Sequence, residues 1–338
     1  MDTRNNEFRE SLSKKRVLVT GATGLVGSVL VRSLLEMDAE VIALIRNPEK
    51  AKEIYKEDAD KIRWIIGDVT DSNSFLPISG DIDYVFHCAA VTASKTMISS
   101  PVETIRTAVA GADNVLSFSV EHHVKTFLYI SSMEVYGTMP EGVIAAEDKL
   151  GFINLSAVRS NYPESKRLCE NLCIAYKEEY GLDIRIARLA QTFGPGVLPW
   201  DHRVFAQFAE SALKKTDIVL HTEGKSEGNY CDTEDMVRGL YTILFRGRPG
   251  ESYNVVNEET HTTIAGMAHM VSHDIAQDSI RVVFDIPQEN VYGYAAETHL
   301  TLSGQKLMSL GWEPQYNLKE MYLRMMNEMR NREDFSDS

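Results

Sequence analysis

Two short stretches of the sequence carry side chains that could act on a substrate hydroxyl. Residues 130–137 read ISSMEVYG and place hydroxyls, a thioether and a carboxylate at the end of an apolar run. Further along, Tyr162 and Lys166 form a Y-x-x-x-K pattern. Residues four apart share one face of a helix, and a lysine ammonium beside a phenol lowers the pKa of that phenol. The pair therefore predicts a tyrosine that serves as a general base near neutral pH.

The elements that must position these groups follow from hydrophobic periodicity. Short β-branched runs predict strands at 16–20, 40–45, 63–68, 84–90, 126–132 and 183–189, with a seventh at 252–256. Helical patterns lie between them, at 25–37, 102–122 and 164–180. Apolar runs without polar alternation indicate strands that are covered on both faces. The fold class is therefore α/β, a doubly wound parallel sheet of Rossmann type.

The second half of the chain has fewer apolar runs and predicts a smaller, mixed domain. Residues 222–230, TEGKSEGNY, predict a turn. We expect a mobile arm at 1–14, a dinucleotide-binding domain at 15–190 to which 233–257 returns, a substrate-binding domain at 191–232 and 258–331, and a mobile tail at 332–338.

A glycine-rich turn follows the first strand. Gly21, Gly24 and Gly27 lie in TGATGLVG, between that strand and a helix. Glycine there permits a tight turn and a close backbone approach to a diphosphate, and the helix N-terminus offers N–H groups to the phosphates. In this βαβ context the turn predicts dinucleotide binding.

The G-x-x-G-x-x-G spacing resembles the extended, epimerase/dehydratase-like branch of the short-chain dehydrogenase/reductase superfamily. GDVTD at 67–71, HCAA at 87–90 and LGWEP at 310–314 are similar to further motifs of that family. The resemblance covers nearly the whole chain and implies NAD or NADP as cofactor. The residues that it implies as cofactor contacts are Gly21, Thr23, Gly24, Leu25, Val26, Gly27, Asp68, Val69, Ala89, Ala90, Tyr162 and Lys166.

The same resemblance assigns roles around Tyr162. Tyr162 is implied as the acid/base, Lys166 as a ligand of the nicotinamide ribose, and Ser132 as the partner of the substrate hydroxyl. Family members that eliminate water carry Asp-Glu after this serine, where the present chain has Met133 and Glu134. A thioether cannot donate a proton to a leaving hydroxide, so dehydration loses its acid. Glu134 stays available as a base, or it is tied to backbone N–H groups or an arginine.

The end of the second strand bears on the choice between the two cofactors. An acidic residue there would accept hydrogen bonds from the ribose 2′-hydroxyl, but this chain has Ile45 followed by Arg46. A guanidinium can pair with a 2′-phosphate, which favours NADP(H) over NAD(H). Arg46 could also be a solvated cation or stack on the adenine of either cofactor.

Two later segments resemble the family's substrate-side motifs. In RLAQTFGPG, Gln191 replaces the usual asparagine beside the sugar. In EGKSEGNYCDTEDMV the family's phosphate-binding arginine falls on Gly228, so Lys225, Arg203 or His202 is expected to supply that charge. The expected substrate contacts are Ser132, Met133, Gln191, Arg203 and Lys225, and the expected ligand is a nucleotide-diphosphate sugar.

The composition excludes several other classes of protein. A net charge of −14 argues against a nucleic-acid or membrane-surface binder, and no apolar run approaches the roughly 20 residues of a membrane span. The four cysteines form no C-x-x-C pair and indicate free thiols in a cytoplasmic protein. The histidines suggest no metal site. The two long helices at 102–122 and 164–180 could form a four-helix homodimer interface, as in similar proteins.

The leading hypothesis is a nucleotide-sugar epimerase that works through a keto-sugar intermediate. Decarboxylation of a sugar uronate or dehydration, each with Glu134, and NADPH-dependent reduction of a keto sugar are the alternatives within the enzyme class. A cofactor-sensing regulatory protein is the alternative outside it. The joint presence of Ser132, Tyr162 and Lys166 counts against a sensor, because a sensor does not need all three.

Overall fold

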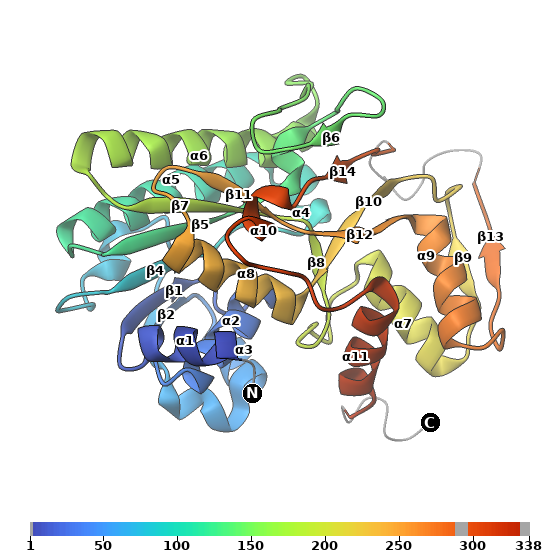
Figure 1. The fold of residues 1–338 in the computed structure, drawn as a ribbon, viewed down its shortest axis with the longest axis horizontal. Coiled ribbons are helices and arrows are strands. Elements are labelled where there is room, and N and C mark those ends of the chain that lie inside the picture. Colours follow the sequence, from blue (N-terminus) through green and yellow to red (C-terminus); the bar gives the residue numbers. More distant parts are fainter. Residues whose placement is uncertain (1–2, 288–296, 332–338) are drawn as a thin grey trace.

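The larger of two regions is built on a seven-stranded sheet (Figure 1). In this computed structural model, residues 3–287 and 297–331 are described. The strands lie in the order β3 (Arg63–Ile66), β2 (Glu40–Ile45), β1 (Arg16–Thr20), β4 (Tyr84–His87), β5 (Thr126–Ser132), β7 (Ile184–Leu189) and β11 (Ser252–Val255). Every pair in the ladder is parallel. The expected doubly wound α/β fold is confirmed.

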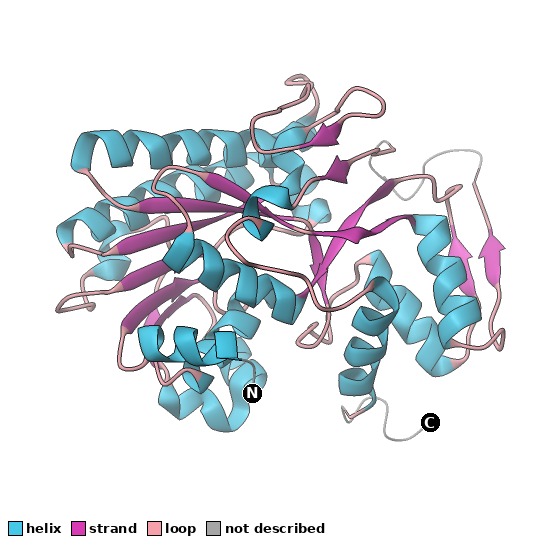
Figure 2. Cartoon of the chain, viewed as in Figure 1, coloured by secondary structure: helices cyan, strands magenta, loops and turns pink. Residues whose placement is uncertain are grey.

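Helices cover both faces of this sheet (Figure 2). One face packs against α2 (Leu25–Glu36), α3 (Pro48–Tyr55) and α8 (Thr233–Arg246), and the other against α5 (Pro101–Glu121) and α6 (Asn161–Tyr180). Leu128 and Ile130 of β5 belong to the first core, whereas Phe127 and Tyr129 belong to the second. Since successive strand residues point to opposite faces, the unbroken apolar runs are accounted for.

The smaller region begins as the chain leaves β7. It holds a three-stranded sheet of β8 (Gln191–Phe193), β10 (Glu227–Asp232) and β12 (Asn257–Thr263), and a parallel pair of β9 (Ile218–Leu220) and β13 (Val282–Phe284). Around them lie α7 (Val204–Lys214), α9 (Ile264–Met270) and α11 (Leu318–Arg330). Residues 301–302 (β14) pair with 144–145 (β6), and α10 (Gln305–Met308) and α4 (Ser94–Ser99) complete the helices of the described residues. The chain returns to the large sheet through α8 and β11.

The expectation of a mobile arm at 1–14 was wrong for the residues that follow Asp2. α1 (Thr3–Leu12) is a helix, and Phe8 and Leu12, one turn apart, are buried. The Phe8 ring lies 5.6 Å from that of Tyr241 on α8, measured between centroids. Two apolar side chains are enough to anchor the helix because both reach the same core. The tail expected at 332–338 lies outside the described residues.

The expectation of a turn at 222–230 was wrong in its second half, where β10 begins. The polar residue Asn229 is fully buried, yet its amide is satisfied. Its Nδ2 donates to the carbonyl of Glu258 at 3.2 Å, and its Oδ1 accepts from the Leu302 N–H at 2.9 Å. A buried polar group with partners fits a strand interior, which its residue type alone did not indicate.

Candidate active site

The candidate residues follow three strands whose carboxyl ends lie side by side. Thr20 pairs with His87, and His87 with Tyr129, so β1 and β4 end at one level of the sheet and β5 continues beyond it to Ser132. The glycine turn, the segment with Ala89 and Ala90, and Ser132 come next along these strands. Ligands of open parallel sheets bind at this edge.

The glycine turn leaves no room for side chains at two of its positions. Gly21 has a φ of +72°, and a Cβ there would lie 2.6 Å from the backbone nitrogen of Ala89. At Gly27 a Cβ would lie 2.3 Å from the carbonyl oxygen of Gly21. α2 therefore starts in direct contact with the turn, which is the arrangement that brings helix N–H groups to a diphosphate.

The start of α2 is open to a ligand. Gly24 is its N-cap, and no side chain among the described residues caps the helix. The hydroxyl of Tyr55 donates to the Ala22 carbonyl at 2.6 Å and fixes the turn from behind. The first N–H groups of a helix lack internal partners, so an anion suits this position. The other expected contacts of this turn are Thr23, Leu25 and Val26. The geometry fits a dinucleotide diphosphate.

Arg46 and Asp68 meet beyond this turn, at the exits of β2 and β3. An Arg46 guanidinium nitrogen lies 3.6 Å from Asp68 Oδ2. Burial alone would raise the pKa of Asp68, but hydrogen bonds from Thr70 and the charge of Arg46 lower it. Val69 is buried, and its carbonyl accepts from Asn114 at 2.8 Å. The expected adenosine contacts are thus held together.

Ser132 and Tyr162 form the centre of the site. Ser132 ends β5 and caps the short 3₁₀ turn Met133–Tyr136, accepting from the Glu134 N–H at 3.2 Å. Tyr162 lies in the first turn of α6 and is buried. Burial raises the pKa of Tyr162 to about 12, and the charge of Glu134 adds to this. The neighbouring Ser132 hydroxyl acts in the opposite direction, so the two side chains lie close together.

Lys166 lies close to Tyr162 on the same helix, and burial is the largest influence on the pKa of each side chain. The Lys166 ammonium donates to the Ile130 carbonyl at 2.7 Å, and it lies 5.9 Å from the centre of the Tyr162 ring. Burial lowers the pKa of Lys166. The cations that lower the pKa of Tyr162 are Arg159 and Arg203. In the protein alone, burial raises the pKa of Tyr162 more than the nearby charges lower it, and the tuning of the phenol by Lys166 stays a prediction.

Glu134 is held by an arginine. Arg159 Nη2 donates to Glu134 Oε1 at 2.9 Å, which is one of the alternatives that the sequence left open. Met133 is partly buried against Val135 and its neighbours in a small apolar cluster. The residue that would be the acid of a dehydratase is therefore a packing side chain in this protein.

The three other expected substrate contacts occupy different surroundings. Arg203 is the N-cap residue of α7, forms a bidentate pair with Asp201, and acts electrostatically on Tyr162. Lys225 is exposed and pairs with Glu223. Gln191 opens β8 with an exposed side chain. Of these three residues, Arg203 is the one whose charge is described as acting on Tyr162.

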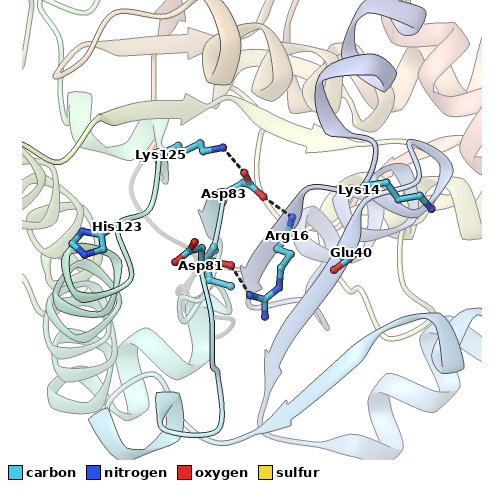
Figure 3. A pocket seen from close by; sticks show the side chains of 8 residues that line it. Lys14, Arg16, Glu40, Asp81, Asp83, His123 and Lys125 are labelled. Carbon is cyan, nitrogen blue, oxygen red and sulfur yellow. Dashed lines mark hydrogen bonds and ion pairs between the residues drawn. The ribbon is translucent and has the colours of Figure 1, made fainter.

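A depression at the opposite, amino end of the sheet has different chemistry (Figure 3). The Lys125 ammonium donates to Asp83 Oδ1 at 2.7 Å, and the Arg16 N–H donates to Asp83 Oδ2 at 3.0 Å. The Arg16 guanidinium donates to the Asp81 carbonyl at 2.6 Å. These charges satisfy one another, and the depression contains none of the candidate reacting groups.

Residues 3–287 and 297–331 lack two kinds of structural feature. Within these ranges, no cluster of three or more His, Cys, Asp or Glu side chains could hold a metal ion. No helix in them has the length and apolar character needed to cross a membrane.

Comparison with known proteins decides the family. Residues 17–256 match the model of the NAD-dependent epimerase/dehydratase family. The chain belongs to this family. UDP-glucuronic acid decarboxylase 6 of Arabidopsis thaliana is 31% identical over 327 residues, which are 94% of this chain and 89% of the relative. The resemblance to extended short-chain dehydrogenases/reductases is thereby confirmed.

Solved structures of the epimerase/dehydratase family share the fold over nearly the full length. An epimerase from Methanothermobacter thermautotrophicus superimposes with a TM-score of 0.83 at 26% identity, covering 99% of this chain and 98% of the other. UDP-glucose 4-epimerase of Thermus thermophilus, solved with NAD, gives 0.78 at 25% identity, covering 94% and 99%. The protein is thus an enzyme of the nucleotide-sugar epimerase/dehydratase type that uses NAD(P).

One site residue of this epimerase/dehydratase-type chain was not found in the sequence. Arg159 lies one helical turn before Tyr162, and its guanidinium carbon is 5.6 Å from the centre of the tyrosine ring. Its spacing of three residues from Tyr162 in VRSNYPESK was the available signal. The signal is weak, because an arginine at this spacing usually faces solvent.

Proposed function

We propose that this protein is an NAD(P)-dependent nucleotide-sugar epimerase that works through a keto-sugar intermediate. One observation carries the proposal. Buried Tyr162 lies beside the half-buried Ser132, while the next two residues after Ser132 offer no free acid–base pair. Met133 cannot transfer a proton, and Glu134 is bound by Arg159. Such a site supports oxidation and reduction at one carbon and offers no acid–base pair for an elimination step.

The proposed steps use the residues as they are placed. Ser132 donates to the oxygen of a sugar hydroxyl, and Tyr162 takes the proton of that hydroxyl as the carbon is oxidised. A nicotinamide cofactor bound at the glycine turn would supply the acceptor for the hydride of that carbon and the donor for its return. The keto sugar turns within the site and is reduced on its other face, while Tyr162 gives the proton back. The product is an isomer with the same mass as the substrate.

Lys166 has a supporting part in this scheme. Its ammonium is held against the Ile130 carbonyl, at the carboxyl end of the sheet, where a nicotinamide ribose would lie. The ammonium adds positive charge on the side of Tyr162 that faces the strand, which favours the phenolate. Full deprotonation of Tyr162 then depends on further positive charge, and the oxidised nicotinamide ring carries such a charge.

For the cofactor we favour NADP(H), on the evidence of Arg46. Its guanidinium is exposed, follows β2 and is only loosely paired with Asp68 at 3.6 Å, so a 2′-phosphate could take it over. The Thermus thermophilus epimerase was solved with NAD, which makes direct comparison necessary. Calorimetric titration with both cofactors tests the choice. Arg46→Ala should weaken the binding of NADP⁺ and leave the binding of NAD⁺ unchanged. An equal loss of affinity for both cofactors would refute the assignment.

The function is tested with a panel of nucleotide sugars. The purified protein is incubated with each sugar and each oxidised or reduced cofactor, and products are followed by mass spectrometry and NMR. Unchanged mass with a new set of sugar resonances supports epimerisation. Loss of carbon dioxide, loss of water or gain of two hydrogens would each replace it with decarboxylation, dehydration or reduction.

Decarboxylation of a sugar uronate is the second candidate. The relatives named UDP-glucuronic acid decarboxylase favour it, with 31% and 30% identity over 94% of this chain in two cases. Glu134 would serve as its base once Arg159 releases it. UDP-glucuronic acid therefore belongs in the panel.

We also propose a homodimer through α5 and α6, which lie side by side over one face of the sheet (Figure 1). Val102, Ile105 and Leu168 are exposed by 57%, 43% and 52% on these helices. Apolar side chains gathered on two long helices suit a four-helix contact. Sedimentation should give a dimer for the native chain and a monomer for Leu168→Glu. A native monomer would exclude the interface.

A further inference from the structure

Arg159 contacts both groups that flank the reaction centre. It precedes α6 in the short turn Val158–Ser160, and its side chain folds back over the first turn of that helix. One guanidinium nitrogen, Nη2, donates to Glu134 at 2.9 Å, and the guanidinium carbon lies 5.6 Å from the centre of the Tyr162 ring. The carboxylate and the phenol are thus bridged by one cation.

A second guanidinium nitrogen of Arg159, Nη1, takes no part in this bridge. It is buried and has no hydrogen-bond partner within the described residues. Guanidinium N–H groups are strong donors, and a buried donor without an acceptor is unfavourable. An acceptor that arrives with the substrate would remove this deficit.

The charges around Tyr162 explain why a bridge is needed there. Glu134 faces Tyr162 from the 3₁₀ turn after β5, and its negative charge opposes the phenolate. Arg159 and Arg203 favour the phenolate from the turn before α6 and from the start of α7. Among the described residues, Lys166 of α6 and the phenol of Tyr129 on β5 also act on or lie beside Tyr162. Without Arg159, the carboxylate would act on Tyr162 with its full charge.

We propose that Arg159 balances the charge of this site: Nη2 neutralises Glu134 beside Tyr162, and Nη1 donates to an oxygen of the bound sugar. The inference rests on the proposed function for the identity of the ligand. The first half, the charge balance, is independent of which reaction follows oxidation. Arg159 offsets the negative charge of Glu134 and thereby lowers the pKa at which Tyr162 loses its proton.

The charge balance is tested by titrating the phenolate directly. The near-ultraviolet absorbance of the full-length protein with oxidised cofactor is followed against pH, and the Tyr162→Phe variant is subtracted as the blank. Arg159→Gln should move the Tyr162 midpoint upward by about one pH unit. Glu134→Gln should move it downward, and the double variant should return close to the native midpoint.

Matched variants separate charge from structure. Arg159→Lys keeps the charge and should restore most of the native midpoint. Arg167→Gln also removes an arginine that touches the 3₁₀ turn, through the Val135 carbonyl at 2.8 Å, but it does not bridge Glu134 and Tyr162. Its midpoint should equal the native one. A midpoint unchanged in Arg159→Gln, or a double variant no closer to native than Arg159→Gln, overturns the charge balance.

The second half is tested by binding, with UDP-glucose and UDP-glucuronic acid as probes. In the Tyr162→Phe background, the variant that also carries Glu134→Gln and Arg159→Gln should bind the probes about tenfold more weakly than the variant with Glu134→Gln alone. A loss confined to UDP-glucuronic acid identifies the acceptor as a carboxylate, and an equal loss for both probes identifies a hydroxyl. Equal affinity of the two variants for both probes overturns the contact. Failure of the proposed function would show differently, as no turnover of any nucleotide sugar by the native protein.

Discussion

The two ends of the parallel sheet carry similar side chains and treat them in opposite ways. At the amino end, Asp83 accepts from Lys125 and from the Arg16 N–H, so its charge is satisfied at the surface. At the carboxyl end, burial disfavours the charged forms of Tyr162 and Lys166. Nη1 of Arg159 there has no hydrogen-bond partner among the described residues. Both ends have acids and cations within reach of each other.

The contrast separates a structural charge cluster from a candidate reaction centre. Hydrogen bonds and charges hold the pKa of Asp83 below its ordinary value although burial alone would raise it. Burial raises the pKa of Tyr162 and lowers that of Lys166. Groups kept away from water with incomplete partners can respond to a ligand, whereas a satisfied surface pair has little left to gain. The following predictions test this contrast, beginning with the largest expected effect.

Removing the Tyr162 hydroxyl should have the largest consequence. Tyr162→Phe should lower kcat by about 10²–10⁴-fold, because it deletes the proposed acid/base and keeps the ring. The rate of hydride transfer is measured in single turnover by nicotinamide absorbance. Tyr176→Phe, further along α6, removes a hydroxyl that contacts Asp113 at 2.6 Å and serves as the control. If both variants turn over substrate at the native rate, the assignment of Tyr162 as the acid/base is wrong.

Breaking the buried ion pair beneath the site should destabilise the fold. Glu170 accepts from Ser131 at 2.5 Å and from Arg188 at 2.7 Å, with both charged residues buried. Glu170→Gln leaves the guanidinium without its counter-charge, which should cost about 3–5 kcal/mol of unfolding free energy. The midpoint temperature of thermal unfolding should fall by several degrees. A shift as small as that of an exposed pair would show that burial adds nothing at this end.

Asp232 should give a pH-dependent gain when neutralised. Burial raises its pKa to about 6, and its Oδ2 has no partner among the described residues. Because the native pKa exceeds the unfolded value, the charged form destabilises the protein as the pH rises through about 6. Asp232→Asn should therefore raise the unfolding free energy by about 1–3 kcal/mol at pH 8. Asparagine also keeps the cap on the Glu234 N–H.

Denaturant titrations of the Asp232→Asn variant and the native protein at pH 4 and pH 8 provide the check. The advantage of the variant should shrink toward pH 4, where the native acid is itself protonated. An advantage that is largest in acid would contradict the sign of this effect.

The amino end should show the smallest effect. Asp83→Asn removes a surface charge pair and should lower the unfolding free energy by less than about 1 kcal/mol, with less loss at high salt. Since the native pKa lies below its ordinary value, the loss should be present at neutral pH and vanish in acid. Denaturation at two salt concentrations measures it. A loss comparable to that of Glu170→Gln would erase the contrast between the two ends.

Much of the fold was predictable, because its signals are local. The β-branched runs located all seven strands of the large sheet, and the glycine spacing located the turn before α2. The neighbourhood of Ser132 and Tyr162 followed from motifs that mark a strand end and a helix start. In each case the residues that determine the element are adjacent in the chain.

The remainder depends on contacts between distant segments. α1 was missed because the apolar residues Phe8 and Leu12 are buried by a distant segment that includes Tyr241. β10 was missed because the hydrogen-bond partners of Asn229 come from later segments. Arg159 was missed because its partner Glu134 comes from another turn. The raised pKa of Tyr162 in the protein alone was not foreseen, because a motif does not encode burial.

The position of β11 in the sequence has a consequence for synthesis. β7 is complete at Leu189, but the strand that covers its open edge is not made until residues 252–255. During translation the edge of β7 stays unpaired while the segment between them is produced. Unpaired edges invite wrong partners, so this interval is when the nascent chain most needs protection from aggregation. A chain truncated before residue 255 would leave that edge of β7 unpaired permanently.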